Sequence, residues 1–277
     1  MKDKIYEIER EASRQKQRTY VDPVSGYSVF TSYGLSKRAD CCGCGCRHCP
    51  FGHREVPSER RMELRQSPWI EDAPSASTEF DVVSWSGGKD SFLALRRLQS
   101  EGHGSLMLMT TFDGRTEKVA HQEVTLSMIR KQARALKLPL LLIPLYSEFP
   151  YLTRIEHGLE VLSQNHSIRQ LVFGDLHLEH IRSWREQELQ PLMLKYEFVL
   201  QFPLWNANYL DLLNDLRKSK QECRITAIAH EGCREAIQLG DIFDDTLFRK
   251  LPSGVDQFGE NGEFHTYVSL SGELATD

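Results

Sequence analysis

The segment formed by residues 80–98 constrains the fold of this chain more than any other stretch of its sequence. A run of β-forming residues enters a tight polar turn with two adjacent glycines, Gly87 and Gly88, and leaves it as an amphipathic helix. Glycine tolerates positive φ and lets a ligand approach the backbone closely, because it has no Cβ. The first turn of a helix presents N–H groups and the positive end of its dipole to an anion. The segment therefore predicts a phosphate-binding turn between a strand and a helix.

The same turn carries side-chain donors. Ser86 and Ser91 contribute hydroxyl groups and Lys89 contributes a positive charge, at a spacing that differs from the GxxxxGK[ST] loop. An ordinary polar turn between strand and helix is the alternative interpretation. The hexapeptide resembles the SGGxDS signature of the PP-loop ATP pyrophosphatases. The resemblance implies cleavage of ATP between its α and β phosphates, and a nucleotide site formed by Ser86, Gly87, Gly88, Lys89, Asp90 and Ser91.

Length and composition indicate a soluble globular protein, because 40% of its 277 residues are hydrophobic and 26% are charged. The start of the chain is too charged for a signal peptide, and the longest apolar run, residues 138–145, is too short to span a membrane. We therefore expect a cytoplasmic enzyme. Residues 1–66 hold 13 Lys and Arg against 9 Asp and Glu, which is too mild a surplus to predict nucleic-acid binding.

Five of the seven cysteines lie within nine residues. In a chain without a secretory signal, such a cluster indicates metal or redox chemistry rather than disulfide bonds. Either a tetrahedral zinc site or an iron–sulfur cluster is consistent with these ligands, and His53 is a further candidate. A structural metal is the favoured interpretation, since a module this small buries little apolar surface. The candidate metal ligands are Cys41, Cys42, Cys44, Cys46, Cys49 and His48.

The sequence around these cysteines resembles the small DUF5522 family, whose pattern is YxDPxTGYxVFT followed by CCGxxCRHCPY. The resemblance covers about residues 18–55 and implies no activity that can be carried over. Cys44 is an extra cysteine within the pattern. Residues rich in Pro and Ser follow and read as a linker. The expected organisation is a Cys-rich module at 1–66, a linker at 67–79 and an ATP-binding domain at 80–277.

Strand-like and helix-like segments alternate beyond this linker. The pattern predicts an α/β fold with a doubly wound parallel sheet, Rossmann-like in type, and ligands at the carboxyl ends of its strands. Strands are expected at 105–112, 138–146, 170–173, 198–203 and 224–229, and helices at 123–136, 151–164, 180–194 and 208–218. Three stretches that could carry chemistry follow such strands or lie in loops, namely 174–186, 203–205 and 254–266. Core packing is the alternative interpretation of 203–205.

Together, these stretches resemble the diphthine–ammonia ligase family and its bacterial relatives, the adenine nucleotide α-hydrolase-like proteins, over residues 80–270. The family also has counterparts of His121 and Gln132. The resemblance implies that ATP adenylates a carboxylate and that ammonia then displaces AMP to give an amide. It adds Gly174 and Asp175 to the nucleotide site. It places catalytic groups at Glu260, Glu263, His265, Arg182 and Glu186, although Arg182 and Glu186 also fit a surface salt bridge.

The expected cofactors are ATP and Mg²⁺, with Asp90 or Asp175 as the magnesium ligand. The expected partners are a carboxylate substrate and ammonia, and a homo-oligomer is left open. The chain departs from the family at Gln257 and Phe258, where Pro and Cys are common. Two other functions stay open. One is a tRNA-modifying enzyme that uses Cys46 and Cys49 for sulfur delivery, and the other is a non-catalytic nucleotide sensor.

Overall fold

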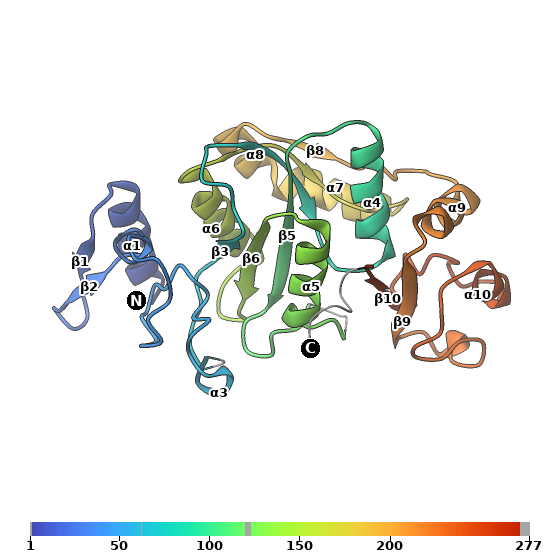
Figure 1. Ribbon diagram of the computed structural model, residues 1–277, viewed down its shortest axis with the longest axis horizontal. Coiled ribbons are helices and arrows are strands. Elements are labelled where there is room, and N and C mark those ends of the chain that lie inside the picture. Colours follow the sequence, from blue (N-terminus) through green and yellow to red (C-terminus); the bar gives the residue numbers. More distant parts are fainter. Residues whose placement is uncertain (1, 62, 120–122, 272–277) are drawn as a thin grey trace.

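A central mixed sheet organises the part of the chain that the computed structural model describes, residues 2–61, 63–119 and 123–271. His121 lies outside these residues. The sheet has six strands in the order β3-β6-β5-β4-β7-β8 (Figure 1). Their bounds are β3 (Trp69–Glu71), β4 (Glu79–Ser84), β5 (Leu106–Asp113), β6 (Leu140–Leu145), β7 (Ser167–Val172) and β8 (Val199–Gln201).

Five of these strands are parallel, which confirms the predicted fold class. Strand β4 lies in the middle, with β5 on one side and β7 on the other. The chain therefore reverses its direction of winding next to β4, and this is where ligands bind in open α/β sheets. Strand β3 comes from the predicted linker and pairs antiparallel with β6 at the sheet edge. Residues 69–71 of the predicted linker are thus part of the central sheet.

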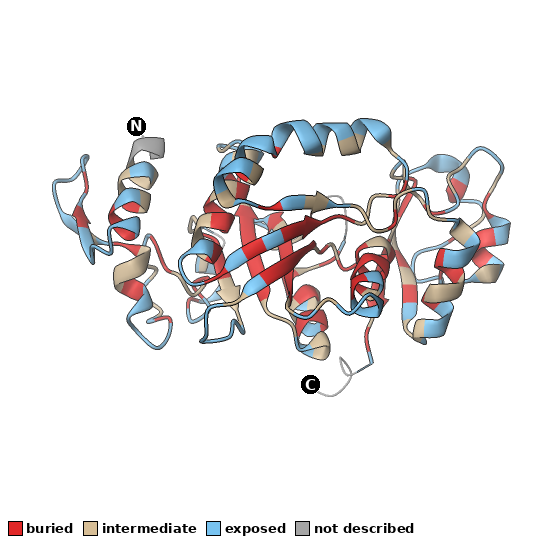
Figure 2. Ribbon diagram, turned by 90° about the horizontal axis from the view of Figure 1, so that it is seen from above, coloured by how far each residue is buried: buried red, intermediate tan, exposed pale blue. Residues whose placement is uncertain are grey.

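Helices cover both faces of the sheet, as Figure 2 shows by its buried strands and exposed outer helices. Side chains alternate along each strand. Val83 and Leu108 pack with α4 (Lys89–Ser100) and α5 (Leu126–Leu136), whereas Val82 and Met107 pack with α6 (Tyr151–Ser163) and α8 (Gln190–Tyr196). No helix formed by the described residues is long and apolar enough to cross a membrane.

The predicted helix at 180–194 is two helices, α7 (Glu179–Glu188) and α8. Pro191 lies in the first turn of α8. A proline has no N–H to donate and its ring clashes with the preceding turn, so it fits a helix start and interrupts a longer helix. The sequence carried this signal, and the single predicted helix was wrong at this point.

The C-terminal segment forms a separate lobe beside α4, on the right in Figure 1. The strand expected at 224–229 is β9 (Glu222–Ile228), but it pairs antiparallel with β10 (Phe264–Ser269) and not with the central sheet. Only Cys223 and Ile225 of β9 are buried, so the strand has the half-exposed pattern of a two-stranded ribbon. The lobe also contains α9 (Tyr209–Ser219), the 3₁₀ turn η1 (Glu231–Cys233) and α10 (Asp245–Lys250).

The Cys-rich module lies at the opposite end of the molecule, on the left in Figure 1. Its helix α1 contacts α6, because Arg10 and Arg14 both form ion pairs with Glu160. Within the module, buried Glu9 accepts hydrogen bonds from the hydroxyl of Ser13 and the backbone N–H of Ser32. The elements are α1 (Lys2–Arg14), β1 (Thr19–Val21), β2 (Ser28–Phe30), α2 (Ser32–Ser36) and α3 (Ser58–Arg61).

Asp81 makes the stability of the domain dependent on pH. Burial alone would raise the pKa of this fully buried carboxyl, but hydrogen bonds from Arg169 (2.7 Å) and His103 (2.7 Å) outweigh burial and hold the pKa below its usual value. A lowered pKa stabilises the fold above the unfolded-state pKa of about 4, and that stabilisation is lost as the pH falls. We expect Asp81→Asn to lower the free energy of unfolding by about 2 kcal/mol at pH 7. In urea denaturation at a series of pH values, the free energy of unfolding of this variant should fall less steeply toward acid pH than that of the wild type. A fall as steep as that of the wild type would contradict this assignment.

Candidate active site

The turn between β4 and α4 has the predicted positive φ at one of its two glycines, since Gly88 has a φ of −88°. Gly87 has a φ of +82°, and a Cβ on it would lie 2.8 Å from Oε1 of Gln132. Gln132 is buried and donates to the carbonyl oxygens of Gly87 (2.9 Å) and Val268 (2.7 Å), while Trp85 donates to its Oε1 (2.8 Å). The side-chain amide of Gln132 therefore fixes the Ser86–Ser91 turn, and only a glycine at position 87 leaves room for it.

The N-cap residue of α4, Gly88, provides no side-chain cap of its own. The hydroxyl oxygens of Ser86 and Ser91 lie 3.4 Å apart, and the Ser91 hydroxyl donates to the Gly88 carbonyl at 3.0 Å. The backbone N–H of Lys89 donates to Oγ1 of Thr266 at 3.1 Å. Strand β10 thus takes up one of the N–H groups expected for the phosphate and fixes the turn from the C-terminal lobe.

Lys89 does not project into the turn as a free charge. Its side chain is buried, and Nζ donates to Oδ2 of Asp90 at 2.9 Å. The same Nζ lies between 5.4 and 5.7 Å from the ring centroids of Phe243, Phe258 and Phe264, all in the C-terminal lobe. A cation over aromatic faces is stabilised by their quadrupoles. Lys89 therefore joins the lobe to the domain, and the predicted direct contact with phosphate needs another side-chain rotamer.

Asp90 fits the predicted magnesium ligand. Its Oδ1 is buried and has no hydrogen-bond partner, and burial together with the charge of Asp175 raises its pKa against the opposing effect of Lys89. A carboxylate oxygen without a partner is what a divalent cation requires, and Mg²⁺ combines such oxygens with those of phosphate. Asp175 is less suited, because Arg185 engages both of its oxygens, at 2.7 and 3.1 Å.

Gly174 brings the end of β7 against the start of α4. A Cβ at this position would lie 2.7 Å from the carbonyl oxygen of Asp90 and 3.1 Å from the backbone nitrogen of Ser91. Both contacts are with backbone, which cannot move aside without shifting the turn. Gly174 therefore contributes to the site by close packing.

Glu260 reaches this edge of the sheet from the C-terminal lobe. Its Oε1 accepts from the backbone N–H of Leu176 at 2.8 Å. Burial, and next the charges of Asp90 and Asp175, raise the pKa of Glu260 to about 7 against the opposing effects of the Leu176 N–H and Lys89. A carboxyl with this pKa exchanges a proton readily at neutral pH. The structure thus brings residues 86–91, 174–176 and 260 to one place.

Three neighbours of Glu260 were not anticipated. Asp256 accepts from the backbone N–H of Glu260 (3.1 Å) and from the hydroxyl of Tyr209 (2.7 Å). The same hydroxyl lies 3.1 Å from Nδ1 of His177. No local pattern joins His177, Tyr209 and Asp256, although His177 and Asp256 lie within the segments 174–186 and 254–266 that the sequence singled out.

Glu263 faces into its own loop. It is buried, and its two oxygens accept from the backbone N–H groups of Asp256 (2.9 Å) and Asn261 (3.0 Å). These contacts disfavour the expected contact with substrate and make Glu263 a positioning residue for the loop. His265 is half-buried on β10, opposite Ala227 of β9.

Arg182 and Glu186 form an ion pair on the outer face of α7, 2.8 Å apart. Both side chains are about a third to a half exposed, so the pair contributes little to stability. The guanidinium of Arg182 also lies over the rings of Phe202 (5.0 Å) and Trp205 (4.8 Å). The salt-bridge interpretation of this pair fits these contacts, and a catalytic role for it stays a prediction.

Comparison with known proteins identifies two segments of the chain. Residues 81–195 match the diphthamide synthase N-terminal domain, and residues 8–55 match DUF5522, a family of unknown function. This part of the central domain is therefore similar to the PP-loop domain of diphthamide synthase. The family match contains the Ser86–Ser91 turn and Asp175 and ends before the lobe that carries Glu260.

A solved structure described as a predicted subunit of a tRNA methyltransferase, from Methanocaldococcus jannaschii, also resembles the chain. The two share 19% sequence identity with a TM-score of 0.37, over 70% of this chain and 97% of the other. At this score the likeness adds nothing to the fold described above.

Four of the five cysteines of the DUF5522 segment lie in two pairs. The sulfur atoms of Cys42 and Cys46 are 3.6 Å apart, and those of Cys41 and Cys49 are 3.8 Å apart. Two thiolates on one tetrahedral zinc ion lie about 3.8 Å apart, given Zn–S bonds of about 2.3 Å. Among the residues that the structure describes, however, no three His, Cys, Asp or Glu side chains gather to hold one metal ion. Each pair taken alone has the sulfur–sulfur distance expected for two ligands of one metal ion.

The other expected ligands are engaged elsewhere. Nε2 of buried His48 lies 2.9 Å from the hydroxyl of Tyr20, and Nε2 of His53 lies 2.7 Å from the carbonyl oxygen of Cys46. Each histidine keeps a buried Nδ1 without a partner. The thiol of Cys44 donates to the carbonyl oxygen of Cys42 at 3.4 Å.

We expect protein purified without oxygen to carry zinc or iron in the DUF5522 segment. The physical reason is the density of thiols at ligand spacing. Elemental analysis distinguishes the two metals, and Cys42→Ser with Cys46→Ser should remove the metal without changing ATP binding. A metal-free chain with a folded segment and freely titratable thiols would refute this expectation.

Proposed function

We propose that this protein is an AMP-forming ligase that adenylates a carboxylate and transfers ammonia to it. The observation that carries the proposal is the position of Glu260, a half-buried carboxyl with a pKa of about 7, at the edge where the PP-loop ends. Holding a nucleotide needs no such group, since N–H donors and cations suffice for phosphate. A proton-accepting carboxyl beside the phosphate site fits a reaction in which an amine attacks.

The first step is attack of the substrate carboxylate on the α-phosphorus of ATP. A bond forms between carboxylate oxygen and phosphorus, and the bond to the bridging oxygen breaks, so pyrophosphate leaves. The start of α4 and the hydroxyls of Ser86 and Ser91 would offset the charge that develops. Asp90 would hold Mg²⁺, which neutralises phosphate charge when bound. Positioning and electrostatics account for most of the acceleration in such transfers.

In the second step ammonia attacks the acyl carbon, the amide forms and AMP leaves. The nitrogen must lose a proton, and Glu260 is the group suited to accept it. Glu263 and Asp256 keep Glu260 in place, because both hold the loop through backbone N–H groups. The role proposed for His265 is secondary.

The products test the proposal. Purified protein with ATP, Mg²⁺, ammonium and a fractionated metabolite extract should release AMP and pyrophosphate in equal amounts. Nitrogen-15 ammonium should appear in an amide of the acid consumed. ADP and phosphate as products would exclude cleavage between the α and β phosphates. AMP release without incorporation of nitrogen would support the adenylation step and exclude the transfer of ammonia.

A further inference from the structure

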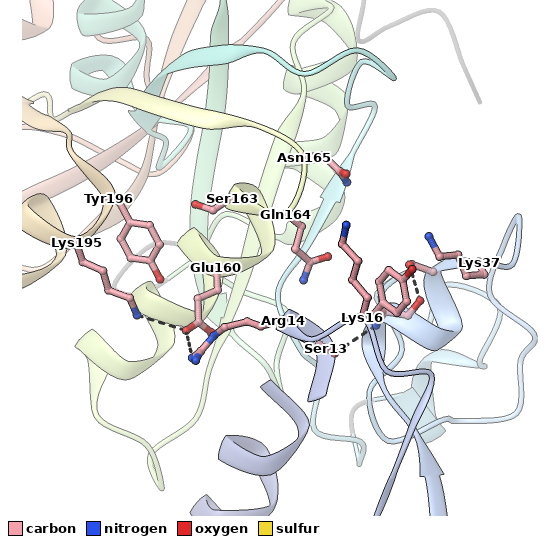
Figure 3. A pocket seen from close by; sticks show the side chains of 12 residues that line it. Ser13, Arg14, Lys16, Lys37, Glu160, Ser163, Gln164, Asn165, Lys195 and Tyr196 are labelled. Atoms are coloured by element: carbon pink, nitrogen blue, oxygen red, sulfur yellow. Dashed lines mark hydrogen bonds and ion pairs between the residues drawn. The ribbon is translucent and has the colours of Figure 1, made fainter. Parts of the chain in front are cut away.

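A second pocket lies at the junction of the DUF5522 module and the PP-loop domain. Figure 3 shows side chains from both parts around it, and its volume is about 500 Å³. Arg14 is the last residue of α1, Lys16 lies two residues beyond it, and Lys37 follows α2. Lys195 and Tyr196 come from the end of α8. Pockets of this size hold small molecules rather than single ions.

The topology separates this pocket from the PP-loop. Helix α6 leads into the amino end of β7, and α8 leads into the amino end of β8. The PP-loop follows the carboxyl end of β4, and these three strands are parallel. The pocket therefore lies toward the opposite edge of the sheet, and a small molecule bound in it occupies a site distinct from that of the proposed ligase reaction.

Positive charge exceeds negative charge in the pocket. Glu160 is the carboxylate that lines it, and Arg14 (2.9 Å) and Lys195 (3.6 Å) both pair with it. Lys16 and Lys37 form no ion pair with any carboxylate of the described residues. Two ammonium groups without a counter-charge match one phosphate dianion. Figure 3 shows them beside the same open space.

The rest of the lining suits the organic part of a ligand. The ring of Tyr196 lines the pocket, and its hydroxyl is turned toward Lys195. The side-chain amides of Gln164 and Asn165 face the same space in Figure 3. Amides, a phenol and aromatic faces are the groups that bind the sugar and base of a nucleotide.

We propose that this pocket binds a phosphomonoester of nucleotide size, with its phosphate on Lys16 and Lys37 and its organic part against Tyr196. Because both parts of the protein line the pocket, the ligand ties the DUF5522 module to the PP-loop domain. The proposal is independent of the ligase reaction. It needs neither ATP turnover nor a metal in the cysteine cluster.

Hydrogen exchange of the full-length protein, read by mass spectrometry, tests the proposal with AMP as the probe and adenosine as the uncharged comparison. AMP should protect peptides that cover residues 13–16, 160–165 and 195–196. Lys16→Glu combined with Lys37→Glu should weaken this protection at least about tenfold, measured as the AMP concentration at half effect. Protection of residues 86–91 should stay unchanged in that variant.

Lys131→Glu is the matched control, because Lys131 is exposed on α5, away from the pocket. It should leave both regions as in the wild type. Inorganic phosphate should compete with AMP at the pocket. Protection confined to residues 86–91 would overturn the proposal. So would equal protection by adenosine, or protection that survives the double charge reversal.

Discussion

Asp90→Asn should lower the rate of AMP release by at least about a hundredfold while the protein stays folded. Asp90 offers an unpartnered carboxylate oxygen at the start of α4, where the phosphates and Mg²⁺ of ATP would lie. Asparagine keeps an oxygen for the Lys89 ammonium, but it loses the charge that Mg²⁺ requires. Steady-state AMP release with Mg²⁺ varied measures the effect, and the loss should persist at saturating Mg²⁺.

Asparagine is chosen because it keeps a hydrogen-bond acceptor for buried Lys89, which Asp90→Ala removes. Both variants remove the counter-charge of Lys89, and the loss of one partner of a buried ion pair costs about 3–5 kcal/mol, so the melting temperature is measured beside the activity. Asp211→Asn, at an exposed position in the first turn of α9, is the control for loss of a carboxylate. Full activity of Asp90→Asn would remove Asp90 from the metal site and leave the metal to other oxygens.

The strand–turn–helix at 80–98 was predictable because its determinants are local. The glycines, the hydroxyls and the amphipathic helix lie within twenty residues, and Gly87 has the expected positive φ. The rotamer of Lys89 was not predictable. It depends on Phe243, Phe258 and Phe264, which follow more than 150 residues later and have no signal in the turn itself.

The partner of β9 was not predictable for a similar reason. A β-forming run gives no information on which strand it joins, because pairing depends on contacts distant in sequence. The pairing of β9 with β10 positions Val268 so that its N–H donates to the carbonyl of Gly87 at 3.0 Å. The C-terminal lobe therefore stabilises the PP-loop through a contact between segments distant in sequence. Neither segment predicts this contact by itself.

Glu260 and Glu263 show that residue type alone does not predict the role of a carboxylate. Both stand in one glycine-rich segment, and the family resemblance implies the same role for both. Gly259 and Gly262 have positive φ values of +69° and +84°. The backbone therefore turns immediately before Glu260 and again immediately before Glu263. The result is that Glu260 meets Leu176 across the site, while Glu263 turns back to bind Asp256 and Asn261.

Glu260→Gln should reduce amide formation by about a hundredfold to ten-thousandfold, the range for losing a positioned base. Glutamine can still accept from the Leu176 N–H, so the fold and ATP affinity should remain close to the wild type. Glu263→Gln should behave differently. It weakens charge-assisted bonds to two backbone N–H groups and should cost about 1–3 kcal/mol of stability.

A paired measurement separates the two variants. Calorimetry gives ATP affinity and melting temperature, and single-turnover analysis with ammonium gives adenylate and amide. Glu260→Gln should accumulate adenylate at an unchanged melting temperature, since only the second step needs the base. Glu263→Gln should melt earlier and lose activity in proportion to the disordered loop. If Glu260→Gln abolishes ATP binding, its carboxyl belongs to the nucleotide site. If Glu263→Gln alone accumulates adenylate, the assignment of the two carboxylates is reversed.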